Sequence, residues 1–250
     1  MGLNTVFHII GLQNNMEILI IFIIHWYLSL FVQTFFLHRY ASHQMFRMNN
    51  FTEKFFFILT WLSQGPSFLE PAAYALMHRK HHRMSDEDDD PHSPVKFSNW
   101  FKFMFKTFDE YRAFKDDVAK NKYKDKNLPR WPKFENIVDT YTVRILFALS
   151  YITFYIYFAP NLFFFLLIPI HILMGPIHGF IVNWFGHKHG YRNFKMLEDN
   201  SKNTLHIDFL MMGELYQNNH HRYPQKMNFA VKWFEVDFGF YILKILHFLD

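Results

Sequence analysis

The sequence contains no cysteine among its 250 residues. This absence excludes a disulfide framework, a thiolate zinc site, an iron–sulfur cluster and a cysteine nucleophile. Any metal must therefore be bound by other side chains, and the sequence is rich in one of them. It has 16 histidines, whose imidazoles bind iron, zinc or copper. The length allows one domain, 1–250, rather than two.

Basic residues are missing from three long stretches. None occurs before Arg39, none between Lys54 and Arg79, and none between Arg144 and Lys188. Because Lys and Arg are enriched in cytoplasmic segments beside a membrane, we expect all of them on the cytoplasmic side. The net charge of +4 follows this topology, so we expect no nucleic-acid partner.

The stretches without basic residues are apolar, which predicts an integral membrane protein. Residues 16–37 are long enough to span a bilayer, and 145–159 with 162–185 form a helical hairpin. Residues 55–77 are broken by Gly65-Pro66, and a full crossing would place the basic segments beside them on opposite faces. We therefore expect a re-entrant or in-plane helix there, buried by protein.

Two remaining segments, 79–139 and 187–250, mix aromatic and charged residues at helical spacing. Such amphipathic pieces lie on a membrane surface. The sequence thus predicts an all-α membrane protein with about three spanning helices, one re-entrant or in-plane helix and a helical cytoplasmic cap.

The histidines of interest form four clusters, which this topology places on one membrane face. The clusters are His38 with His43, His78 with His81 and His82, His187 alone, and His220 with His221. On an α-helix, residues three or four apart share a face, whereas neighbours diverge by about 100°. One helix can therefore offer His81 and His82 to two neighbouring metals. His38 and His43 are five apart, so we expect them to diverge and to serve different ions.

Eight imidazoles are too many for one zinc ion and fit two non-haem irons better. A lone pair of surface histidines is usually solvated, but the repeated His-x-x-His-His pattern favours a metal site. Gln217 lies one turn before the last pair, as a weak ligand or a hydrogen-bonding neighbour. Asn183, one turn before His187, is a candidate to act through water.

Three carboxylates are candidates to orient ligand imidazoles from outside the metal coordination sphere. They are Glu214, Asp86 and Asp90. An ordinary solvated glutamate fits Glu214 equally, and for Asp86 and Asp90, within the acidic run 86–90, a solvated loop is the favoured interpretation. Among the other histidines, His171 and His178 are seven apart, which places them on one helix face within an apolar stretch. His92 has no partner pattern.

The pattern resembles the membrane fatty-acid desaturase superfamily, specifically its Δ9 acyl-CoA (stearoyl-CoA desaturase-like) branch in a bacterial form. The matching motifs, in family order, are His38-Arg-Tyr-Ala-Ser-His43, His78-Arg-Lys-His81-His82, Asp90-Pro91-His92, Asn183-x-x-x-His187-x-x-Gly190 and Gly213-Glu214-Leu-Tyr-Gln217-Asn-Asn-His220-His221. The resemblance extends from about residue 35 to residue 224. It implies that the family's metal ligands correspond to the eight clustered histidines.

The resemblance also implies an oxidoreductase that uses dioxygen and two non-haem irons. Its expected reaction introduces a cis double bond, at Δ9, into a long-chain acyl-CoA or acyl-lipid. Electrons are expected from a separate donor of ferredoxin, rubredoxin or cytochrome b5 type, because the sequence has no cytochrome b5-like His-Pro-Gly-Gly segment. The expected location is a bacterial inner membrane, with the active site on its cytoplasmic face.

Two positions depart from the family pattern. Gln217 stands where stearoyl-CoA enzymes have histidine, and Met77 stands where they carry an acidic residue that helps to hold the CoA head group. Basic residues beside the motifs, Arg39 among them, are expected to meet an anionic head group or a redox partner.

Two other functions remain open. One is a fatty-acyl or lipid hydroxylase on the same scaffold, although the four-residue gap between His38 and His43 favours desaturases. The other is a membrane sensor or transporter of zinc or iron. Transporters usually carry polar residues through several spans, whereas the apolar stretches here have few.

Overall fold

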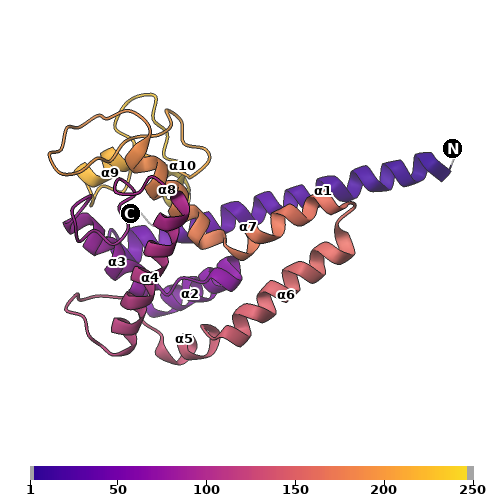
Figure 1. Ribbon diagram of the computed structural model, residues 1–250, viewed down its shortest axis with the longest axis horizontal. Coiled ribbons are helices and arrows are strands. Elements are labelled where there is room, and N and C mark those ends of the chain that lie inside the picture. Colours follow the sequence, from indigo (N-terminus) through magenta and orange to yellow (C-terminus); the bar gives the residue numbers. More distant parts are fainter. Residues whose placement is uncertain (1–2, 247–250) are drawn as a thin grey trace.

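The computed structural model describes residues 3–246, with the surroundings of side chains from residue 16 onward. Within this part the regular elements are helices, and the only strand-like pairings are three isolated β-bridges. Figure 1 shows a long rod, led by α1 (Leu3–Val32), with a cap of shorter helices and loops at one end. The all-helical prediction is confirmed for the described residues. Residues 247–250 of the expected cap lie outside them.

Two helices are long and apolar enough to span a membrane. One is Met16–Ser42, which joins the end of α1 to the helix η1 (Gln33–Ser42), and the other is α6 (Tyr141–Phe158). Side chains of α6 such as Leu146 and Ile156 are exposed, as expected of a surface that faces lipid. These two helices contain the predicted span 16–37 and all but the last residue of 145–159, and their crossing of a bilayer stays a prediction.

The predicted arm 162–185 is two elements with a sharp bend rather than one straight helix. The segment Leu162–Ile172, which contains η3 and α7 (Ile168–Ile172), meets α8 (Met174–Lys188) at 76°. Pro176 has no backbone N–H to donate to the preceding turn, so an unbroken helix is not favoured here. His171 and His178 therefore do not share a helix face, contrary to the expectation from their spacing.

The apolar stretch 55–77 is interrupted where its sequence predicts. It contains α2 (Asn50–Gln64), the short turn η2 (Gly65–Ser67) and the start of α3 (Pro71–Arg83). Gly65 adopts a φ of 49°, which glycine tolerates best, and Pro71 opens α3 with its φ already suited to a helix. The re-entrant placement of this stretch stays a prediction.

The cap surrounds the end of the rod opposite the chain's start (Figure 1). Its helices include α4 (Trp100–Ala119), α5 (Pro132–Val138), α9 (Gln217–Arg222) and α10 (Phe238–Ile245). α3 packs against both η1 and α4, and α8 contacts α9. This packing gathers all four histidine clusters at one end of the molecule.

Candidate metal centre

His38, within η1, and His43, which directly follows its last residue, lie on the same side because this helix is a π-helix. The backbone N–H of His43 donates to the carbonyl of His38, five residues earlier, at 3.1 Å. This i→i+5 bond defines a π-turn, in which residues five apart lie above one another. The ring centroids of the two histidines are 4.9 Å apart. The expectation that they diverge toward different ions is therefore wrong.

Five histidines, which we call the five-histidine group, converge from η1, α3 and α9. They are His38, His43, His78, His82 and His220, and their candidate ligand atoms all lie within 4.8 Å of one another. The Nε2 atoms of His43 and His78 are 2.8 Å apart, and Nε2 of His220 is 3.0 Å from Nε2 of both His38 and His82. So many nitrogens at this spacing suit one shared cation.

The surroundings of these rings favour the neutral imidazole. Burial, followed by repulsion from the neighbouring imidazoles, holds the pKa values of His43, His78, His82 and His220 well below their ordinary range. The rings are therefore neutral. A neutral imidazole has the free lone pair that a metal requires.

The remaining members of the clusters, His81, His187 and His221, form a second set that we call the three-histidine group. Each ring has its Nδ1 against a carboxylate. The contacts are His81 with Asp90 at 2.9 Å, His187 with Asp86 at 3.0 Å and His221 with Asp199 at 2.5 Å. The α3 helix thus divides its histidines between the two groups, as does α9 with His220 and His221.

The Nε2 atoms of the three-histidine group show whether a metal ion fits there. Nε2 of His81, His187 and His221 is buried and has no protein partner. A ring that donates its Nδ1–H to a carboxylate has its lone pair on Nε2. Three buried lone pairs therefore converge with no donor to satisfy them, which costs free energy unless a cation binds. The residues present fit a metal ion.

The three carboxylates remain charged despite their burial. Burial alone would raise the pKa values of Asp86, Asp90 and Asp199, but hydrogen bonds and attraction to their histidine partners outweigh it and lower them. Asp86 also accepts hydrogen bonds from Ser93 at 2.5 Å and from the backbone N–H of Asn200 at 2.7 Å. Sequence reasoning did not find Asp199, because it lies in a loop without a recognisable motif.

A fourth carboxylate, Glu214, contacts the five-histidine group. Its Oε2 lies 2.6 Å from Nδ1 of His38, and its Oε1 accepts from Arg39 at 3.2 Å. Arg39 also donates to Asp237 at 2.8 Å, and its side chain is 0% exposed. The expectation that Arg39 meets a head group or redox partner at the surface is therefore wrong.

The weaker ligand candidates lie beside the two groups. Nε2 of Gln217 donates to the backbone carbonyl of Glu214 at 2.7 Å, and Nδ2 of Asn183 donates to the carbonyl of Gly179 at 2.8 Å. His92 is 5% exposed and both of its ring nitrogens lack a protein partner. Its ring centroid is 4.3 Å from that of His81. The spacing of His92 gave no partner pattern, and only the family motif Asp90-Pro91-His92 marks this position in the sequence.

A separate polar network lies among the apolar helices. Nδ1 of His25 is 2.7 Å from Nδ1 of His171, and Nε2 of His25 is 2.6 Å from the carbonyl of Ser63. Nε2 of His171 is 2.8 Å from the hydroxyl of Tyr155. A carbonyl only accepts, so Nε2–H of His25 donates, and the chain then runs from Tyr155 through His171 to His25. This network joins helices away from the histidine groups.

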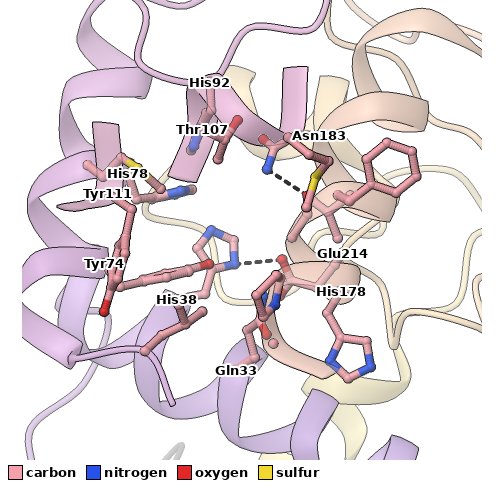
Figure 2. A pocket seen from close by; sticks show the side chains of 18 of the residues that line it. Gln33, His38, Tyr74, His78, His92, Thr107, Tyr111, His178, Asn183 and Glu214 are labelled. Atoms are coloured by element: carbon pink, nitrogen blue, oxygen red, sulfur yellow. Dashed lines mark hydrogen bonds and ion pairs between the residues drawn. The ribbon is translucent and has the colours of Figure 1, made fainter. Parts of the chain in front are cut away.

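A cavity reaches the five-histidine group from between α3, α4 and α8. Figure 2 shows the contact of His38 with Glu214 in the middle of the view, with Tyr74 and His78 on one side and Asn183 on the other. Most of its remaining wall is apolar, namely Leu30, Leu69, Met77, Phe103, Met104, Phe108, Phe180, Val182 and Met211. The cavity therefore suits an apolar group beside the histidines.

Comparison with known proteins agrees with this geometry. The sequence model of the family described as fatty acid desaturase matches residues 17–244. The chain is 27% identical over 222 residues to an acyl-CoA C20 Delta5-desaturase of Anemone leveillei, covering 88% of this chain and 68% of that protein. It is 26% identical over 213 residues to Delta-9 acyl-lipid desaturase 1 of Arabidopsis thaliana, covering 85% and 66%. The chain thus spans about two thirds of the length of these relatives.

Proposed function

Because this chain belongs to the fatty acid desaturase family, whose members are oxidoreductases of lipid metabolism, we propose that it introduces a cis double bond into a long-chain acyl group. The expected position is Δ9. The observation that carries the proposal is the pair of histidine groups beside an apolar cavity. In the balanced reaction, –CH2–CH2– and O2 take two electrons and two protons and yield –CH=CH– and two waters.

The two histidine groups are the proposed sites of two non-haem irons. All eight clustered histidines would be ligands, with five on one iron and three on the other. Gln217 and Asn183 remain candidates for weak or water-mediated contact. When bound, the irons supply the oxidant that breaks unactivated C–H bonds.

The protein's own side chains fix the geometry in which that chemistry operates. Asp86, Asp90, Asp199 and Glu214 each hold the Nδ1 of one histidine, which sets the tautomer and the direction of the ring. The apolar wall of the cavity holds the acyl chain beside the five-histidine group and excludes water. The bond to be oxidised is then chosen by position, since the methylenes of an acyl chain are chemically alike.

The location and the electron supply complete the proposal. The long apolar stretches contain no Lys or Arg, so the basic segments and the histidine end beside them would face the cytoplasm, in the inner membrane of a bacterium. A separate donor of ferredoxin, rubredoxin or cytochrome b5 type would deliver the two electrons.

Expression in a host with defined fatty acids, followed by gas chromatography of its lipids, tests the proposal. We expect a new cis-monounsaturated species that is lost in His81→Ala, together with part of the bound iron. The matched control is His189→Ala, an exposed histidine near the same centre that belongs to neither group, and it should keep the product. Hydroxy acids in place of alkenes would identify a hydroxylase. Neither product, despite bound iron and a working reductant, would contradict both functions.

A further inference from the structure

Helix α4 presents an exposed aromatic stripe next to its buried face. Phe103 and Tyr111 are buried, whereas Phe101, Phe105 and Phe108 are 54%, 66% and 55% exposed. The three exposed rings are four and three residues apart, so they form one row along the helix. Soluble proteins seldom expose a contiguous row of aromatic side chains to water. Helices that lie in a membrane interface, in contrast, often have such a row.

The charges of α4 fit such an interface. Lys102 and Lys106 are exposed and alternate along the helix with the aromatic row. A lysine keeps its ammonium among the head groups while its stem lies against apolar surface. Figure 1 shows α4 crossing beside α8, at the end of the rod where the cap begins. The row is therefore placed to meet the boundary between acyl chains and head groups.

The cavity reaches the molecular surface at this row. Phe108 lines the cavity and is at the same time 55% exposed, so the cavity wall and the outer surface meet at its ring. Pro176 and Gly179 of α8 line the same cavity and are also partly exposed, whereas Gly175 is buried. Residues of the cavity wall therefore reach the surface on both helices.

Nearer the start of α4, aromatic rings of α4 and α8 pack against each other. The ring centroids of Trp100 and Phe180 are 5.9 Å apart, and those of Phe103 and Trp184 are 5.5 Å apart. The opening at Phe108 is therefore bounded on this side. Its α8 edge belongs to the bent helix pair that is apolar enough to span a membrane. The opening thus adjoins a segment that we expect to face lipid.

We propose that the gap between α4 and α8 at Phe108 is a lateral entrance for the acyl chain of a membrane glycerolipid. The ester group stays at the interface while the chain enters the cavity and passes His38 and His78. The chain never leaves an apolar environment on this route, so entry from the bilayer needs no extraction into water. The substrate is then an acyl-lipid rather than a soluble acyl thioester. This inference rests on the proposed desaturase function.

Separate isotopic labels on the two carriers distinguish them. The iron-loaded protein, with a reductant, is placed in vesicles of phosphatidylcholine whose stearoyl chains are deuterated, and unlabelled stearoyl-CoA is added. We expect the deuterium label to appear in monounsaturated phosphatidylcholine. Unsaturation confined to the unlabelled thioester would overturn the entrance and leave the desaturase function standing. If neither carrier is desaturated, the desaturase function itself has failed.

A second measurement needs no catalysis. The protein is illuminated in vesicles that contain phosphatidylcholine with a diazirine on one acyl chain, and the cross-linked peptides are identified. We expect cross-links in residues 104–108 and 175–179. Phe108→Trp should lower the cross-linking of 175–179 about tenfold, because a larger ring overfills the gap.

The matched control is Phe105→Trp, on the same exposed row but not in the cavity wall. It should leave the cross-links at 175–179 unchanged. Equal losses in both variants would show that the row only seats α4 on the membrane. Cross-links confined to the outer face of α6 would also overturn the entrance.

Discussion

Glu214 bridges Arg39 and His38: one carboxylate oxygen accepts from the guanidinium at 3.2 Å and the other lies 2.6 Å from Nδ1 of the imidazole. Burial alone would raise the pKa of Glu214, but attraction to His38 and then to Arg39 lowers it. The carboxylate thus remains charged inside the protein. It fixes the tautomer of a histidine whose Nε2 faces the five-histidine group.

Glu214→Gln tests this bridge. The amide keeps the shape of the side chain but removes the negative charge, so Nδ1 of His38 loses its charged acceptor. We expect metal affinity at the five-histidine group to fall about 10–100-fold, as for other losses of such partners. Titration of the metal-free protein with Fe(II) measures the change. Glu110→Gln, at a surface ion pair with Lys106, is the control and should leave affinity unchanged.

Arg39 is expected to contribute more to stability than any exposed arginine. Replacing it with leucine leaves Glu214 and Asp237 buried without their partner, which costs about 3–5 kcal/mol in comparable cases. Thermal unfolding in detergent should show a much lower midpoint for Arg39→Leu. The matched change Arg47→Leu, at an exposed position, should leave the midpoint nearly unchanged. Similar midpoints for the two variants would contradict the role of the buried network.

The π-helix is expected to be required for metal binding. One alanine inserted between Tyr40 and Ala41 lengthens the spacing of His38 and His43, so they no longer lie above one another. We expect the purified protein to lose iron from the five-histidine group, measured as iron per chain. An alanine inserted after Asn121, in an exposed loop, should leave the iron content unchanged. Full iron in the first variant would mean that His43 is not needed.

Glu70 is expected to make stability depend on pH. Burial, followed by repulsion from Glu135, raises its pKa to about 7. A carboxyl with a raised pKa stabilises the fold fully below its unfolded pKa of about 4.3, and this contribution is lost as the pH rises through about 7. Glu70→Gln should therefore raise the unfolding midpoint at pH 8 and change it little at pH 5. The same gain at both pH values would show that ionisation is not the cause.

The sequence predicted the helical class, the apolar segments and the histidines that meet, because each depends on composition or on short spacing. The split of His81 and His82 between two groups also followed from helical geometry. The pairing of His38 with His43 did not, since sequence spacing assumes an α-helix where tertiary packing selects a π-helix. The bend between α7 and α8 likewise depends on how the two pieces pack against their neighbours.

Asp199 and Arg39 show a second limit. Asp199 precedes His221 by 22 residues, and the two meet only because the loop that contains Asp199 lies beside α9. Arg39 follows a histidine that faces the cavity, and its charge suggested a surface role. Its burial depends on Glu214 and Asp237, which are 175 and 198 residues away. Partners at such separations leave no local pattern.

The five-histidine group also has a consequence for the order of assembly. Four of its members lie within the first 82 residues, whereas the fifth, His220, emerges from the ribosome only after the membrane helices between them. During synthesis the four earlier histidines therefore precede the fifth, and the group stays incomplete while the rest of the chain is made. Completion of the five-histidine group is a late event, and a metal captured then would hold residues 38–82 and residue 220 together. Iron supply would in this way act on the yield of folded protein as well as on its activity.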